Sequence, residues 1–169
     1  MKQLIVLIGS NAVGKSTTAR KYVELHPKTA YVDSDWCRVM NPFSFTDATK
    51  QTVSENIYCL IHNYLNCNDI NTVIFTYSWH GVRKEIYDNV IEKLRSNSIE
   101  FDEKIIILKC SENENIKRAH MDARDKARIK RGMDHTFSFY DIYDYPCIDT
   151  TNFTPEQVVT EINNLLKEV

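Results

Sequence analysis

The stretch GSNAVGKST, residues 9–17, follows the apolar run Leu4–Ile8 and contains the pattern GxxxxGK[ST]. Glycines let backbone N–H groups point inward around an anion, and a helix N-terminus adds the positive end of its dipole. In this pattern Lys15 reaches the outer phosphates of a nucleotide, and the Ser16 hydroxyl binds Mg²⁺. The sequence therefore predicts a phosphate-binding loop made of Gly9, Ser10, Asn11, Ala12, Val13, Gly14, Lys15, Ser16 and Thr17.

The context of this loop is a chain in which short apolar runs alternate with helical patterns. Predicted strands are Lys2–Ile8, Ala30–Val32, Thr72–Tyr77, Lys104–Cys110 and Pro146–Asp149. Apolar residues recur with helical spacing between them, as in Val53, Ile57, Leu60, Ile61, Tyr64 and Leu65. Capping patterns at Ser111–Glu114 and Thr154–Gln157 indicate two more helix starts. Alternating strands and helices predict an α/β fold with a parallel sheet.

Length and composition limit the class of protein. The 169 residues form one predicted domain, and 21 basic against 23 acidic residues leave no extended surface for nucleic acid. No apolar run approaches the roughly 20 residues that span a bilayer. Five cysteines without metal-ligand spacing indicate reduced thiols, so we expect a cytoplasmic protein with a small-molecule partner. The sequence leaves the oligomeric state open.

Two carboxylates follow the second predicted strand, in the segment DSDWCR, residues 33–38. The carboxyl ends of parallel strands share one edge of a sheet, so Asp33 and Asp35 should face the phosphate-binding loop. We assign Asp33 to the metal, with Ser16, and Asp35 to the acceptor hydroxyl, whose proton it takes or which it orients. A solvated acidic turn is the alternative. Motifs of GTPase switches and of transporter ATPases are missing from the sequence.

A basic segment, KRAHMDARDKARIKR, covers residues 117–131. Arg124, Arg128 and Arg131 would form one cationic edge on a helix. Guanidinium groups suit phosphate oxygens, so we predict a mobile basic lid at about 117–135, with Arg124 and Arg128 as catalytic residues. The alternative is a solvated helix face.

Candidate acceptor-binding residues lie after the second and third strands. Aromatic faces and guanidinium groups there suit a planar or sugar-like molecule with a hydroxyl or an anion. Trp79 has a core position as its alternative role, and His80 a local hydrogen bond. The predicted acceptor-binding residues are Asp35, Trp36, Arg38, Trp79, His80 and Arg83.

Together, GSNAVGKST, DSDWCR, the arginine-rich segment and IDTTNFTPEQVV (residues 148–159) resemble the small P-loop kinases related to nucleoside monophosphate kinases. That group includes shikimate, gluconate, adenylylsulfate and chloramphenicol kinases. The resemblance implies a three-layer P-loop NTPase fold with a five-stranded parallel sheet in the order 2-3-1-4-5. It also implies that Arg118 stacks on adenine and that the turn with Asn152 closes the other side of the base.

The resemblance has one clear departure. Shikimate kinases carry a glycine cluster after the third strand, whereas this chain reads TYSWHG, residues 76–81, with Gly81 alone. Loop, carboxylates and basic segment together predict an ATP- and Mg²⁺-dependent phosphotransferase acting on a small hydroxylated acceptor. The alternatives are a nucleoside, nucleotide or polynucleotide-end kinase, and an NTP-binding regulatory module without efficient transfer.

Overall fold

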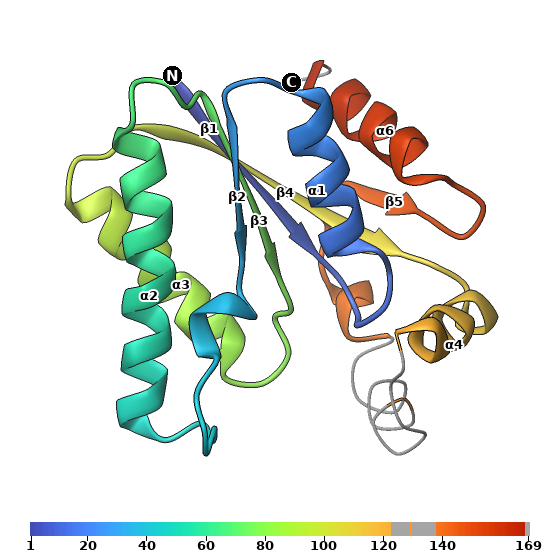
Figure 1. Cartoon of the computed structure of the whole chain (residues 1–169), viewed down its shortest axis with the longest axis horizontal. Coiled ribbons are helices and arrows are strands. Elements are labelled where there is room, and N and C mark those ends of the chain that lie inside the picture. The colour runs from blue at the N-terminus through green and yellow to red at the C-terminus, as the bar shows by residue number, and fades with distance from the viewer. Residues whose placement is uncertain (123–128, 130–137, 168–169) are drawn as a thin grey trace.

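The computed structural model describes residues 1–122, 129 and 138–167, and these residues build a parallel sheet flanked by helices (Figure 1). Its strands lie in the order β2 (Thr29–Asp33), β3 (Thr72–Tyr77), β1 (Lys2–Ile8), β4 (Phe101–Lys109) and β5 (Cys147–Asp149). Every pairing is parallel. The predicted α/β fold and the strand order 2-3-1-4-5 are confirmed.

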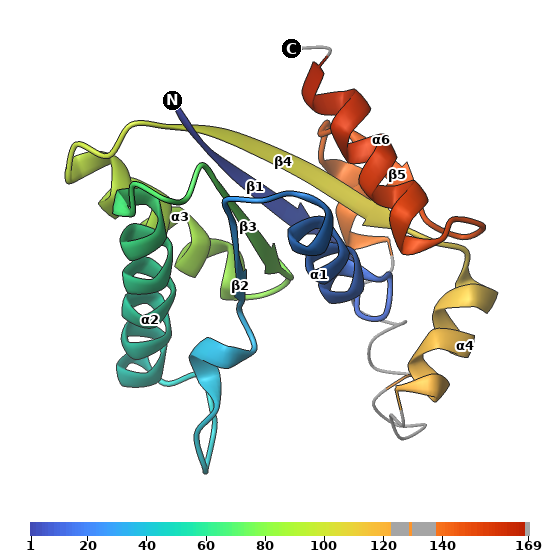
Figure 2. The same ribbon diagram turned by 45° about the horizontal axis from the view of Figure 1, so that its top comes forward.

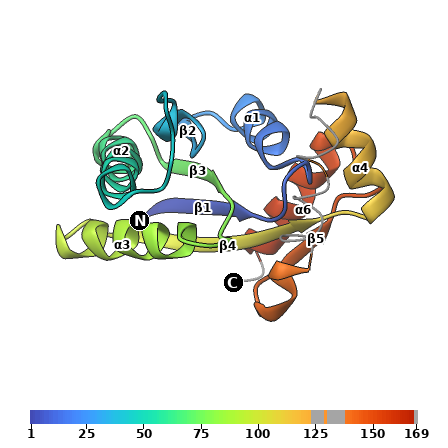
Figure 3. The same ribbon diagram turned by 90° about the horizontal axis from the view of Figure 1, so that it is seen from below.

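Side chains alternate across the central strand and so create two cores. Leu4, Val6 and Ile8 face the cluster formed with α2 (Asp47–Asn66) and α3 (Arg83–Ser96). Ile5 and Leu7 face the cluster formed with α1 (Lys15–Leu25) and α6 (Pro155–Lys167). Figure 3 shows α1 and α3 on opposite sides of the sheet, which confirms the three layers.

Helix starts follow the capping residues that the sequence indicates. The Ser111 hydroxyl accepts a hydrogen bond from the Glu114 N–H at 3.3 Å and caps α4 (Glu112–Met121). Thr154 and Gln157 bond reciprocally at the start of α6. Thr46 and Thr49 form the same kind of box before α2. Short 3₁₀ turns cover Trp36–Arg38, named η1, and Phe139–Ile142, named η2.

Strand boundaries differ from the predicted ones where strands are half exposed. β4 begins at Phe101, three residues before the predicted start, because Phe101–Glu103 pair with the first residues of β1. These residues are partly exposed and include two acids, so an apolar run does not reveal them.

The carboxyl ends of β1, β2 and β3 lie at one edge of the sheet (Figure 2). The loop to α1, the η1 turn and the start of α3 leave from this edge, so they lie around a common space. Among the described residues, no helix is both long enough and apolar enough to span a bilayer.

Candidate nucleotide and acceptor site

The loop between β1 and α1 has the backbone that an anion cradle requires. Gly9, Ala12 and Gly14 all adopt positive φ angles, of 148°, 63° and 97°. A Cβ atom on Gly9 would lie 2.3 Å from the Leu108 carbonyl oxygen, so only glycine fits there. Gly14 is the N-cap of α1 and brings no side chain to cover the first N–H groups of the helix. The helix N-terminus therefore presents its backbone donors to the cleft.

Lys15 lies folded over this loop. Its Nζ donates hydrogen bonds to the carbonyl oxygens of Gly9 at 2.9 Å and Ser10 at 2.7 Å. Asn115 of α4 holds the loop from behind, because its amide donates to the Asn11 carbonyl at 2.7 Å. The ammonium group thus lies within the cradle, next to the backbone donors.

The two carboxylates differ in their surroundings. Asp33 is 7% exposed, and its Oδ2 accepts hydrogen bonds from Ser16 Oγ at 3.0 Å and from the Tyr31 hydroxyl at 2.5 Å. Its Oδ1 accepts from the Asp35 N–H at 3.0 Å. The Asp35 carboxylate is two-thirds exposed and is held by Arg38, whose Nε lies 3.1 Å from Oδ1. Asp33 is therefore fixed against the phosphate loop, and Asp35 faces the open space.

Ser16 and Asp33 fit a magnesium ion by their chemistry. A hydroxyl and a carboxylate are hard oxygen ligands, 3.0 Å apart here, and both belong to the wall of the same cleft. Mg²⁺ commonly takes one or two protein ligands and completes its shell with water and phosphate oxygens. Among the described residues, no group of three or more His, Cys, Asp or Glu side chains is placed to hold a metal.

One cavity, of about 420 Å³, brings the two halves of the predicted site together. Its wall runs from the phosphate loop over the carboxylate pair to the start of α3. The residues lining it are Asn11, Ala12, Gly14, Lys15, Ser16, Thr17, Arg20, Asp33, Ser34, Asp35, Arg38, Thr76, Ser78, Arg83 and Asp122. The structure thus places Asp35, Arg38 and Arg83 of the predicted acceptor set beside the phosphate loop.

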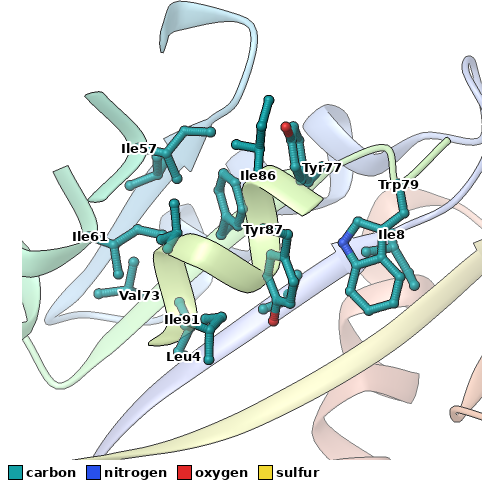
Figure 4. Close-up of a cluster of buried hydrophobic side chains, with 14 of the residues drawn as sticks. Leu4, Ile8, Ile57, Ile61, Val73, Tyr77, Trp79, Ile86, Tyr87 and Ile91 are labelled. Carbon is teal, nitrogen blue, oxygen red and sulfur yellow. The ribbon is translucent and has the colours of Figure 1, made fainter. Parts of the chain in front are cut away.

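Other members of that acceptor set lie elsewhere. Trp36 is about half exposed and meets the ring of Tyr31 edge-on, with 5.0 Å between ring centroids. Trp79 is fully buried beside Ile8 and Tyr87 (Figure 4). The prediction that Trp79 contacts the acceptor is therefore corrected: its large apolar ring is part of the core, because it packs against the rings of Tyr87 and Tyr143.

His80 lies beside the cavity and does not line its wall. Its Nε2 accepts a hydrogen bond from Arg83 Nη1. Burial, together with the charges of Arg83 and Lys15, lowers the pKa of His80 to about 4. The imidazole is therefore neutral near pH 7, with its hydrogen on Nδ1.

A second, more apolar cavity of about 280 Å³ opens behind the phosphate loop. Arg118 lies in its wall and donates hydrogen bonds to three residues: to Thr150 Oγ1 at 2.9 Å and the Thr150 carbonyl at 2.7 Å, to Glu114 at 2.9 Å and to the Val13 carbonyl at 3.4 Å. Phe153, 40% exposed, and Met121, 78% exposed, also line it. A guanidinium, an aromatic ring and a thioether therefore line one space next to the loop.

Sequence reasoning found part of this second cavity. It named Arg118, which lines the space, and Asn152, which is exposed and lies one residue before Phe153. Phe153 and Met121 were missed, although an aromatic residue in the turn TTNF was the available signal. The predicted lid begins at Lys117 inside α4, and its catalytic candidates Arg124 and Arg128 lie outside the described residues.

Comparison with known proteins finds solved structures of the same fold, but no match to a family model or a curated protein. Solved structures match over nearly the whole chain. A sugar kinase from a Janibacter species has 13% identity and a TM-score of 0.66, over 99% of this chain and 95% of its own. The tunicamycin resistance protein of Deinococcus radiodurans has 14% identity and a TM-score of 0.67, over 98% and 96%.

Two further matches have informative ligands. Shikimate kinase from Acinetobacter baumannii, solved with shikimate, has 14% identity and a TM-score of 0.64, over 99% of this chain and 94% of its own. The adenylylsulfate (APS) kinase of Mycobacterium tuberculosis, solved with AMPPNP and APS, has 18% identity and a TM-score of 0.63, over 98% of both chains. The resemblance drawn from sequence is thus confirmed for the fold: this chain has the fold of the small P-loop kinases.

Proposed function

We propose that this protein is a phosphotransferase that uses Mg²⁺-ATP to phosphorylate a hydroxyl group of a small acceptor. The observation that carries the proposal is the single cavity joining the phosphate loop to Asp35. A protein that only binds a nucleotide has no need of a carboxylate facing open space beside the loop. Solved kinases of the same fold, with acceptors such as shikimate and APS, support the reaction class.

The second cavity supports ATP as the donor. Its apolar wall, with Arg118 and Phe153, suits the stacking of a base, while the loop donors and Lys15 suit the phosphates. Ser16 and Asp33 would hold Mg²⁺, which supplies charge neutralisation for the phosphate oxygens.

The chemistry asked of the chain is mainly positioning and electrostatics. The acceptor oxygen forms a bond to the γ-phosphorus as the bond to the β,γ-bridging oxygen breaks, and ADP leaves. Asp35 takes or orients the hydroxyl proton, and Arg38 holds its carboxylate in place. Lys15 stabilises the negative charge on the transferring group. Asp33 is committed to Ser16, Tyr31 and the Asp35 N–H, which supports its assignment to the metal.

The test is Asp35→Asn in a screen of Mg²⁺-ATP against pooled sugars, polyols, nucleosides, nucleotides and hydroxy acids. Mass spectrometry would detect any compound that gains a phosphoryl group. We expect a product with the parent chain and a kcat about 10²–10⁴-fold lower with Asp35→Asn, because the proton acceptor is lost. Affinity for ATP should change little.

Asp47→Asn is the matched control, since this acid lies at the start of α2, is paired with Lys50 and does not line the cavity. It should leave turnover unchanged. ATP binding without a product from any compound, or an Asp35→Asn variant as active as the parent, would contradict the proposal.

A further inference from the structure

The first residue of α3, Arg83, is a cation that forms no ion pair with any carboxylate in the described part of the chain. It lines the same cavity as Asp35 and Arg38. Arg83 contacts the neutral imidazole of His80 and the ring of Phe45, whose centroid lies 5.4 Å from Cζ. No carboxylate among the described residues forms an ion pair with it, whereas Arg38 is paired with Asp35.

The absence of an ion pair matters because Arg83 is partly buried and its Nε is enclosed. Burial, helped by the charge of Arg38, lowers the pKa of Arg83. A guanidinium in such a place is normally compensated by an anion, since an uncompensated charge away from water is costly. An anion that enters the cavity would supply this compensation.

The surroundings of Arg83 are also rich in hydrogen-bond donors. Four buried polar side-chain atoms have no partner among the described residues: Arg83 Nε, His80 Nδ1, the Tyr77 hydroxyl oxygen and, in the core, Trp79 Nε1. Arg83 Nε carries a hydrogen, and so does His80 Nδ1, because the other ring nitrogen accepts from Arg83. Buried donors are nearly always paired, so the surroundings of Arg83 hold more donors than acceptors.

Lys15, Arg38 and Arg83 all line the cavity but have different contacts. Lys15 lies over the phosphate loop, and Arg38 is engaged with Asp35. Arg83 belongs to a third element, the first turn of α3, and lines the same cavity as Lys15 and Asp35. An anionic acceptor that reaches from Asp35 to Arg83 would place its negative charge next to Arg83.

We propose that the acceptor carries an anionic group, a carboxylate or a phosphate, and that Arg83 binds this group while Asp35 faces the hydroxyl to be phosphorylated. This inference rests on the proposed function and adds the charge of the substrate to it. Neutral sugars, polyols and nucleosides would then be poor acceptors.

The experiment compares matched acceptors in the presence of Mg²⁺-ATP: D-glucose against D-gluconate, glycerol against D-glycerate, and thymidine against thymidine 5′-phosphate. The sugar and glycerol pairs test a carboxylate, and the thymidine pair tests a phosphate. A mass-spectrometric screen of further neutral and anionic compounds extends the series. We expect phosphorylation of anionic members alone. A neutral compound phosphorylated as well as its anionic counterpart would overturn the inference while leaving the phosphotransferase itself intact.

Arg83→Gln then tests the residue. Its KM for the anionic acceptor should rise at least 30-fold, with kcat and the affinity for ATP changed less than threefold. Lys84→Gln is the control, because Lys84 is the next residue but lies over the Trp79 ring, 4.8 Å from its centroid, and pairs with Asp88. It removes the same charge from the same helix and should leave KM unchanged. Equal KM values in the parent and Arg83→Gln would refute the assignment.

A binding measurement covers the case in which no compound is phosphorylated, which would contradict the proposed function. Thermal unfolding is followed with AMPPNP bound, with and without sodium gluconate or thymidine 5′-phosphate. Stabilisation by one of these anions that is lost in Arg83→Gln and kept in Lys84→Gln would support an anion site. No stabilisation of the parent, or the same stabilisation in all three proteins, would overturn it.

Discussion

The phosphate side of the cavity is formed mainly by main-chain atoms, whereas the acceptor side is formed by side chains. The phosphate side is main chain: a loop with three positive φ angles, the N-terminus of α1 and one lysine folded over it. The acceptor side is made of side chains from η1, β3 and α3, above all Asp35, Arg38 and Arg83. Main-chain geometry permits little variation, whereas side chains are replaced without changing the fold. The difference explains how one fold serves kinases of many acceptors.

The largest effect should come from breaking the main-chain side with Gly9→Ala. The added Cβ would lie 2.3 Å from the Leu108 carbonyl, so β1 and β4 must move apart or the loop must change its path. We expect ATP binding to fall below detection in calorimetric titration. The free energy of unfolding should drop by about 1–3 kcal/mol, the usual cost of overpacking.

Gly81→Ala is the matched control for that change. Gly81 also has a positive φ, of 63°, but an added Cβ would meet nothing within 4 Å. The variant should lose about 1 kcal/mol of stability from backbone strain and keep its affinity for ATP. If both variants bind ATP equally well, the claim that ATP binding depends on a fixed main-chain geometry of the phosphate side is wrong.

A smaller effect is expected where the two sides meet, at Tyr31. Its hydroxyl donates to Asp33 Oδ2 and lies 3.1 Å from Thr76 Oγ1, so it positions the carboxylate that also bonds the Asp35 N–H. Tyr31→Phe removes one hydrogen bond to a charged group, which is worth about 1.5–3 kcal/mol. We expect kcat to fall roughly tenfold or somewhat more, with the dissociation constant of ATP little changed.

Rates at saturating acceptor and isothermal titration with ATP would measure the two quantities. Tyr58→Phe serves as the control, since Tyr58 packs against Lys93 between α2 and α3, away from the carboxylates. A parallel loss of kcat in both variants would show that the Tyr31 contact has no special role.

The smallest effect concerns stability at acid pH and depends on His80, which lies next to Arg83. The pKa of His80 is lowered from 6.5 to about 4 in the folded protein, because burial disfavours its charged form. Between these values the unfolded chain binds the extra proton, so stability contributed by His80 is present above pH 6.5 and is lost as the pH falls toward 4.

His80→Gln keeps an acceptor for Arg83 and removes the titrating group. Urea unfolding at pH 7.5 and pH 5 should show a smaller loss of stability at pH 5 for the variant than for the parent. If both proteins lose the same free energy of unfolding, His80 titrates normally and the wall beside Arg83 is more open to water than the structure indicates.

Sequence patterns predicted the phosphate side nearly in full. The loop residues, the strand before it and the helix after it depend on local chemistry, since glycine and the helix terminus act within nine residues. The carboxylate pair was also accessible, because Asp33 and Asp35 follow directly on a strand whose end must face the loop. The strand order came from the resemblance to P-loop kinases, and pairing of the strands confirmed it.

The acceptor side was only partly predictable because its residues are placed by packing. Arg83 and Trp79 lie four residues apart and were given the same role, yet one lines the cavity and the other is fully buried. Phe153 and Met121 likewise meet Arg118 only through the packing of α4 against the turn after β5. Sequence spacing does not tell which way a side chain points after a strand ends.

The amino-acid sequence by itself thus determined a phosphate-binding loop, a strand and helix on either side of it, and two acids at a strand end. These features arise from backbone conformation, capping and hydrophobic periodicity, which act over a few residues. Only the tertiary structure decided that Tyr77 and His80 surround Arg83 with unpaired polar atoms, and that Asp33 is enclosed while Asp35 is open. Burial and charge compensation depend on contacts between segments far apart in the chain, and such contacts exist only once the sheet has assembled.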